Sequence, residues 1–188
     1  CGAGVYFALR YTSATNGTLI YTSSPVLILL LEWIFRGRRI VPREMIGIVL
    51  AVAGVVTIVV KGSLSILLGL DLNAGDIVFA FAALSWAVYS VLLKRPEFTG
   101  VPTLSLFAVL ALAGAITLLP FTAWEIAETG RFPTSPAAWS SIAGIAFISS
   151  VLAFSCFQYG VKILGPATTG VFMYLLPPYG VMMAVVFL

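Results

Sequence analysis

The sequence is poor in charge. Only 9% of its 188 residues are Asp, Glu, Lys or Arg, and none is His, whereas 61% are hydrophobic. About a quarter of the residues in a soluble domain are charged, and a water-soluble fold of this size could not cover its surface with so few charges. The composition therefore excludes a soluble enzyme, a nucleic-acid-binding domain and a disordered chain.

Residues that carry catalysis or bind metals are equally scarce. Cys1 and Cys156 both lie in apolar stretches, so the sequence predicts neither a disulfide framework nor a metal site. It has no paired carboxylates and no Ser–His or Cys–His set. We therefore predict no catalytic residue, no metal, no cofactor and no nucleic-acid partner.

Long apolar runs are what the sequence has in abundance. A hydrocarbon core about 30 Å thick requires ~20 apolar residues in a helix, and six runs have about that length without the alternation of a membrane barrel. The sequence predicts an all-α polytopic membrane helix bundle, with Asp76 capping its third helix. The six predicted spans are Thr15–Phe35, Glu44–Val60, Asp76–Leu93, Pro102–Trp124, Ala137–Tyr159 and Pro166–Leu188.

The few basic residues divide unevenly between alternate loops. Seven of the ten follow the first, third and fifth spans, and three lie in the intervening loops. The positive-inside rule places the richer side in the cytoplasm, which predicts a multi-pass protein of the cytoplasmic (inner) cell membrane. The residues predicted on the cytoplasmic side are Arg36, Arg38, Arg39, Arg43, Lys94, Arg95 and Lys162.

Two stretches share a pattern at a constant offset of 152 positions. In Ala8–Pro25 and Gly160–Pro177, a basic residue precedes a span whose Pro lies about 11 residues in. Under the predicted topology the two copies cross the membrane in opposite senses, as the inverted repeats of secondary transporters do. The alternative is two unrelated spans that each contain a Pro.

Three stretches resemble the drug/metabolite transporter superfamily, specifically the EamA-type ten-span transporters. They are ALRYTSATNGTLIYTSSPVLILLLEWIFRGRR (Ala8–Arg39), EMIGIVLAVAGVVTIVV (Glu44–Val60) and GDIVFAFAALSWAVYSVLLKR (Gly75–Arg95), and Ile148–Pro177 resembles the matching part of the second repeat. The resemblance implies two inverted five-helix repeats with both termini in the cytoplasm. It also implies transport of a small metabolite, with export favoured.

The resemblance further implies that the chain is a piece running from the end of family span three into span nine. Residues 1–60 would be the C-terminal part of the first EamA repeat, 61–75 an external connecting loop, and 76–188 the second repeat without its last span. Glu32 departs from the family pattern, which usually has an apolar residue at this position.

Prolines within the spans mark candidate kinks. Pro25, Pro177 and Pro178 cannot donate to the carbonyl one turn earlier, and each lies near the predicted midplane. Carbonyls freed at that depth require protein, water or a ligand as a partner. The functional interpretation is a pair of kinked, gating helices around a cavity, and the alternative is a structural kink satisfied by neighbouring helices.

Polar and aromatic side chains in the same spans are candidate substrate contacts. Hydroxyls, amides and rings suit a neutral or zwitterionic organic molecule, although Ser and Thr in membrane helices often bond to the backbone instead. The candidate substrate-binding residues are Asn16, Thr18, Thr22, Trp86, Tyr89, Gln158 and Tyr174.

Glu32 is the only carboxylate within a span, near its cytoplasmic end, and it could carry a proton. Its spacing of four residues from Arg36 favours a salt bridge instead. Proton coupling, facilitated diffusion and exchange therefore all stay open as driving mechanisms. Small residues indicate helix-packing surfaces, at Gly47, Gly54, Gly114 and Gly144.

Together these features predict a secondary transporter that moves a small amino acid-like or drug-like molecule by alternating access, with the lipid bilayer and the substrate as its partners. The first, third, fifth and sixth spans would surround the cavity. Two alternatives are an intramembrane enzyme of lipid or cell-wall precursor metabolism and a membrane scaffold that does not transport. The sequence does not set the oligomeric state.

Overall fold

The computed structural model describes residues 5, 8–9, 11–39, 41–60, 73–98, 100–130 and 132–187. Every regular element in these ranges is helical, and none is a strand. Five helical stretches there are long and apolar enough to cross a membrane, which confirms the all-α polytopic class. They are Thr15–Arg36, Pro42–Val59, Ala74–Leu92, Thr103–Thr129 and Pro136–Leu164.

The chain divides into two compact units whose limits differ from those of the predicted repeats. The first unit joins residues 1–94 to residues 164–188, and the second holds residues 95–163. The start of the predicted second repeat and its last described helices therefore belong with the helices of the first repeat. The connecting loop predicted at 61–75 lies mostly outside the described residues.

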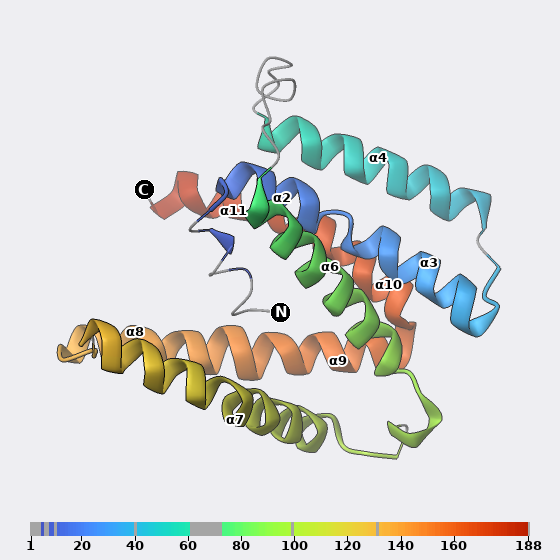
Figure 1. The fold of residues 1–188 in the computed structure, drawn as a ribbon. Helices are drawn as coiled ribbons and strands as arrows, with labels where there is room; N and C mark the ends of the chain where they lie inside the picture. The colour runs from blue at the N-terminus through green and yellow to red at the C-terminus, as the bar shows by residue number, and fades with distance from the viewer. Residues whose placement is uncertain are drawn as a thin grey trace. The chain divides into compact units, whose positions relative to one another are not determined.

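The first unit is built around helix α6 (Ala74–Leu92), which packs against α2 (Ala14–Tyr21) and α3 (Ser24–Arg36). Figure 1 shows α6 passing beside both of these helices. Helix α10 (Pro166–Val171) packs along α3, and α4 (Pro42–Val59) contacts α2. Small or compact side chains fill these contacts without exposure, at Ile28, Ala83 and Ala87.

The predicted first span is interrupted at its middle. Helix α2 ends at Tyr21 with a cap at Thr22, and α3 begins at Ser24 with Pro25 in its first turn. Because Pro has no N–H and is tolerated in a first turn, the break falls where the sequence places Pro25.

The predicted sixth span is also broken, and no piece of it is long enough by itself to be among the five stretches. Helix α10 gives way to a 3₁₀ turn, η3 (Phe172–Leu175), and the chain then continues as α11 (Leu176–Phe187). Pro177 and Pro178 remove the donors that the carbonyls of Met173 and Tyr174 would use in an α-helix. The tighter turn before the two prolines is the local response to that loss.

Asp76 lies at a different cap position from the one predicted. Asn73 is the N-cap of α6, and its side chain accepts a hydrogen bond from the backbone N–H of Gly75 at 3.0 Å. Asp76 is the third helical residue, and its carboxylate accepts from the Asn73 backbone N–H at 2.9 Å. The two residues form a reciprocal capping box.

The second unit consists of η1 (Pro96–Phe98), α7 (Thr103–Thr129) and a long helical stretch after it. That stretch comprises α8 (Pro136–Gly144), a π-helical segment η2 (Ile145–Leu152) and α9 (Ala153–Leu164). The rings of Phe107 on α7 and Phe154 on α9 lie 6.2 Å apart between centroids. The π-helical segment was not expected, because the apolar run around it reads as one α-helix.

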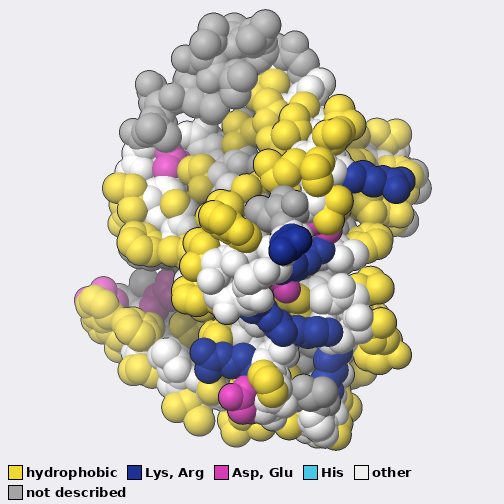
Figure 2. All heavy atoms as spheres, turned by 90° about the vertical axis from the view of Figure 1, so that its right-hand side faces the viewer, with side chains coloured by type: hydrophobic (Ala, Val, Ile, Leu, Met, Phe, Trp, Pro, Cys, Tyr) yellow, Lys and Arg dark blue, Asp and Glu magenta, His cyan; other side chains and the backbone are white. Residues whose placement is uncertain are grey.

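Large apolar side chains are exposed over much of both units. Phe35, Leu50, Phe81, Val109 and Phe147 are each more than 60% accessible. Figure 2 shows hydrophobic side chains over much of the visible surface of the helices, with Lys and Arg side chains between them. An apolar helix surface with charges kept to the turns is what a bilayer requires.

Candidate functional site

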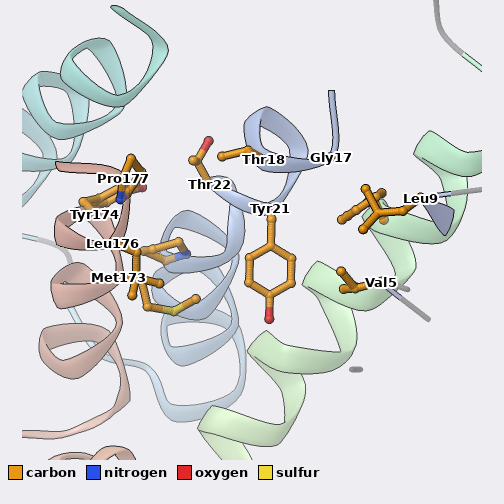
Figure 3. A pocket seen from close by; sticks show the side chains of 12 residues that line it. Val5, Leu9, Gly17, Thr18, Tyr21, Thr22, Met173, Tyr174, Leu176 and Pro177 are labelled. Carbon is orange, nitrogen blue, oxygen red and sulfur yellow. The ribbon is translucent and has the colours of Figure 1, made fainter. Parts of the chain in front are cut away.

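A cavity of about 450 Å³ lies within the first unit, at the two helix breaks. It is bordered by the end of α2, the start of α3, α6 and the segment from η3 into α11. Figure 3 shows Tyr21 in the middle of this site, with Met173 and Tyr174 across from it. The residues lining the cavity are Val5, Leu9, Gly17, Thr18, Tyr21, Thr22, Pro25, Phe79, Met173, Tyr174, Leu176 and Pro177.

Five of the predicted functional residues meet at this cavity: Thr18, Thr22, Tyr174, Pro25 and Pro177. They come from the two stretches that share the Pro pattern, which lie far apart in the sequence. Pro178 is exposed and is not among the lining residues that the structure describes. The helix breaks therefore bring the two patterned stretches to one site.

Trp86 and Tyr89 lie behind the cavity wall. The indole N–H of Trp86 donates to the Met173 sulfur at 3.1 Å, and its ring lies 5.4 Å from that of Tyr89. Met173 itself borders the cavity. Trp86 therefore positions a lining side chain from α6, and direct substrate contact by Trp86 and Tyr89 stays a prediction.

Asn16 is buried in a polar cluster that ties α2 to α6. Its side-chain amide donates to the Asp76 carboxylate at 3.4 Å, and the Thr12 hydroxyl donates to the same carboxylate at 2.5 Å. Asp76 is only 4% exposed, so a buried charge is held here by several donors. This arrangement gives Asn16 a structural contact beside the cavity.

Gln158, the remaining predicted contact, lies on α9 in the second unit. The cavity described here belongs to the first unit alone. A substrate-binding role for Gln158 stays a prediction.

Seven lining residues were not predicted as site residues, and two of them, Tyr21 and Phe79, are aromatic. The others are Val5, Leu9, Gly17, Met173 and Leu176. Tyr21 lies three residues after Thr18 and four before Pro25, so it shares their helix face. Phe79 lies seven residues before Trp86 on α6, again on one face. Helical spacing from residues already singled out would have found both.

Gly17 explains how α2 approaches α6 so closely. A Cβ at this position would lie 2.3 Å from the tip of the Phe79 ring. Close approaches also occur at Gly75, against the Ala8 carbonyl, and at Gly170, against Ile28.

The four glycines predicted at packing surfaces lie elsewhere. At Gly47, Gly54, Gly114 and Gly144, an added Cβ would meet no atom within 4 Å in the described part of the chain. Their packing role stays a prediction.

Glu32 is buried and makes different contacts from those predicted. It pairs with Arg38 at 3.5 Å rather than with Arg36. The reason is that α3 ends at Arg36 and Gly37 takes a left-handed conformation, φ 62°, which turns Arg38 back toward the helix. Arg38 also contacts Glu44 on α4 at 2.5 Å.

One predicted cytoplasmic residue, Lys162 on α9, holds a loop within the second unit. Its ammonium group donates to the backbone carbonyl of Val101, just before α7. A cation at the last turn of a helix is also favoured by the helix dipole.

No group of three or more Cys, Asp or Glu among the described residues is arranged to hold a metal ion. The cavity lining instead offers hydroxyls, rings and a thioether. Such a lining can hold an organic molecule, by apolar contact and a few hydrogen bonds.

The sequence was compared with family models and with known proteins. A model of the EamA-like transporter family matches residues 3–60 and 73–188. The uncharacterized transporter YyaM of Bacillus subtilis (strain 168) is 29% identical over 172 residues, covering 92% of this chain and 56% of the relative. No solved structure matches the chain.

Two further relatives are similar to the chain at about the same level. An uncharacterized transporter of Archaeoglobus fulgidus is 30% identical over 178 residues, covering 92% of this chain and 58% of the relative. The uncharacterized transporter YetK of Bacillus subtilis (strain 168) is 25% identical over 182 residues, covering 97% and 55%. The chain thus spans little more than half the length of the curated relatives it matches.

Proposed function

The chain belongs to the EamA-like transporter family, and from this premise we propose that it forms part of a secondary transporter for a small organic molecule. The transporter works by alternating access and favours export across the cytoplasmic membrane. Arg36, Arg38 and the other basic residues after the first, third and fifth spans face the cytoplasm. The chain itself carries no catalytic activity.

The observation that carries this proposal is the cavity between two broken helices. Pro25 and Pro177 both line it, and each follows a break in a helix that would otherwise be a continuous span. Secondary transporters place substrate near the midplane, where discontinuous helices of two repeats meet. The shared Pro pattern at residues 8–25 and 160–177 supports the same inverted-repeat arrangement.

The cavity is also the right size for the proposed cargo. Its volume of about 450 Å³ lies within the range of roughly 300–1,000 Å³ typical of small-molecule sites. The break between α2 and α3 and the η3 turn are natural hinges, because the helix has no continuous hydrogen-bond ladder there. Movement at these two points would open the cavity to one side of the membrane at a time.

Counterflow in proteoliposomes containing the full-length protein tests the proposal. Vesicles are loaded with a panel of amino acids and other small metabolites, and entry of each labelled compound is followed with and without a pH gradient. Counterflow of one class establishes a carrier, and stimulation by the gradient adds proton coupling. Absence of counterflow across the panel contradicts transport and favours the scaffold or enzyme alternatives.

A matched pair of variants connects the activity to the cavity. Thr22→Trp places a large ring inside it, whereas Thr57→Trp places the same ring on the exposed face of α4. We expect Thr22→Trp to abolish counterflow and Thr57→Trp to retain it. Equal counterflow by the two variants would show that the substrate does not pass through the cavity.

A further inference from the structure

A buried acidic side chain holds the start of α10 against the end of α3. The Glu32 carboxylate accepts a hydrogen bond from the Ala167 backbone N–H at 3.3 Å and pairs with Arg38 at 3.5 Å. Glu32 is only 6% exposed, and Ala167 is also buried. Because a buried carboxylate depends on such donors, moving α10 away from α3 has to break a specific polar contact.

Glu32 lies on the same face of α3 as the cavity. Pro25, Ile28, Leu29 and Glu32 are all buried, and their spacing of three and four residues places them on one side of the helix. Pro25 lines the cavity, and Glu32 follows it by seven residues, which is about 10 Å along a helix. Under the orientation proposed above, this direction leads from the cavity to the cytoplasm.

Between Pro25 and Glu32, helices α3 and α10 are in close contact. Figure 1 shows α10 running beside α3. A Cβ added to Gly170 would lie 2.9 Å from Cδ1 of Ile28 and 3.7 Å from Cα of Pro25. This apolar contact leaves no room for a molecule to pass between the two helices from the cavity toward Glu32.

Helix α10 is short and is interrupted at both ends. It has six residues, it follows Gly165 in a left-handed conformation (φ 91°), and it is followed by the η3 turn. Both interruptions leave the α-helical hydrogen-bond pattern, so α10 can move as a unit about them. A second cavity of about 280 Å³ lies where α10, α3 and α4 meet, bordered by Ala167, Thr168 and Gly47. That space allows α10 to shift without displacing a tightly packed core.

We propose that Glu32 keeps the cytoplasmic side of the cavity closed, and that each transport cycle breaks its contact with Ala167 so that α10 moves away from α3. This rests on the proposed function and assigns the closing contact to one side chain. Glu32 acts through α10, so it is a positioning residue. Arg38 belongs to the turn after α3, so it stays beside the carboxylate when α10 moves, and the buried charge keeps a partner.

Thiol labelling from the cytoplasmic side measures whether the cavity is closed. Thr18→Cys, in the cavity lining, is introduced into the full-length protein with its other cysteines replaced by Ser. Inside-out vesicles are treated with a membrane-impermeant thiol reagent. We expect Glu32→Leu to raise the labelling rate about five- to ten-fold, the effect of one lost hydrogen bond.

Two further variants distinguish the Ala167 contact from the charge of this region. Glu32→Gln should label close to the parent rate, because its amide oxygen can still accept from Ala167. Glu44→Gln is the matched control, since it removes the other carboxylate that pairs with Arg38 and leaves the Ala167 contact in place.

A reversible covalent bridge tests the same step without depending on the folding of Glu32→Leu. Glu32→Cys and Ala167→Cys are combined in the same background and joined by a short bifunctional methanethiosulfonate. We expect the bridge to abolish counterflow and a reducing agent to restore it, because α10 is held against α3 while the bridge lasts. The control pair is Arg38→Cys with Glu44→Cys, which joins the turn after α3 to α4 without involving α10, so its counterflow should persist.

Two results would overturn the proposal: equal labelling of Thr18→Cys in the Glu32→Leu and Glu44→Gln proteins, or counterflow that persists in the bridged Glu32→Cys, Ala167→Cys protein. Counterflow by the unbridged parent separates this proposal from the proposed function. Labelling that depends on Glu32 without counterflow in the parent refutes transport and retains Glu32 as the residue that closes the cavity. Counterflow that the bridge does not change retains transport and refutes the role of Glu32.

Discussion

The Glu32 carboxylate accepts a hydrogen bond from the backbone N–H of Ala167 at 3.3 Å, across 135 positions of sequence. Ala167 lies in the first turn of α10, where backbone N–H groups have no partner within the helix. The same carboxylate pairs with Arg38, and Arg38 pairs with Glu44. One buried acidic side chain thus links α3, the turn after it, α4 and α10.

Replacing Glu32 with Leu should destabilise the protein. The Ala167 N–H would stay buried without its acceptor, a loss of about 1–3 kcal/mol. Glu32→Gln should be milder, because its amide oxygen can still accept that hydrogen bond. Thermal unfolding of the full-length protein in detergent measures both effects.

Glu44→Gln is the control for the two Glu32 variants, since the Glu44 side chain also pairs with Arg38 but is about one-third exposed. Ion pairs near the surface contribute only about 0–1 kcal/mol. A Glu32→Leu protein as stable as the wild type would show that the Ala167 contact does not hold α10 in place.

Gly17→Ala should narrow the cavity. The new Cβ would lie within 3 Å of three Phe79 ring atoms, and Phe79 borders the cavity, so the ring must shift. Overpacking of this kind costs about 1–3 kcal/mol, and we also expect weaker ligand binding. Gly54→Ala is the matched control, because its Cβ would meet open space.

The double variant Gly17→Ala with Phe79→Leu distinguishes overpacking from a backbone effect. Leu is smaller than Phe and leaves room for the added methyl group, so stability should recover relative to Gly17→Ala alone. If the loss of stability in the double variant equals the sum of the losses in the two single variants, the two sites do not interact.

Much of this fold could be predicted from the sequence, because the bilayer limits what a long apolar run can be. The six runs correspond to the observed helical segments, and Pro25, Pro177 and Pro178 lie at observed breaks. The 3₁₀ turn at 172–175 and the π-helical segment at 145–152 were not predictable in the same way. Both depend on which carbonyl each backbone N–H bonds to, and the spacing of apolar residues does not determine that choice.

The site was only partly predictable, for a different physical reason. Spacing along one helix identified Thr18, Thr22 and Pro25, because neighbours on a helix face are fixed by geometry. Whether a polar side chain faces the cavity or another helix depends on tertiary contacts. Asn16 bonds to Asp76 and Trp86 bonds to Met173, and no local pattern reveals either partner.

Asp76→Ala should loosen the contact between α2 and α6. It removes the acceptor of the Thr12 hydroxyl, the Asn16 amide and the Asn73 backbone N–H together. We expect a loss of about 1–3 kcal/mol or more for these buried donors. Hydrogen exchange of the α2 amides measures the local effect.

Asp71→Ala is the comparison for Asp76→Ala, since it removes the same charge just before α6. Equal exchange in the two variants would show that the loss of charge, and not of the specific hydrogen bonds, governs the contact.

Ligand should protect a cysteine placed in the cavity. Thr18 lines the cavity and is exposed within it, so Thr18→Cys in a Cys1→Ser, Cys156→Ser background should react with a small maleimide. A substrate identified by counterflow should slow that reaction several-fold, while labelling of Thr134→Cys stays unchanged. Equal rates with and without the substrate at Thr18→Cys would place its binding site elsewhere.

The orientation in the membrane can be tested with two exposed positions of the second unit. Gly100 follows the third span, on the side with more basic residues, and Thr134 follows α7 on the other side. The positive-inside rule places Gly100 in the cytoplasm and Thr134 outside. With Cys1→Ser and Cys156→Ser together as the background, a membrane-impermeant thiol reagent should label Thr134→Cys on intact cells and should label Gly100→Cys only after permeabilisation. The reverse pattern would invert the topology and, with it, the side toward which the cavity is proposed to release its cargo.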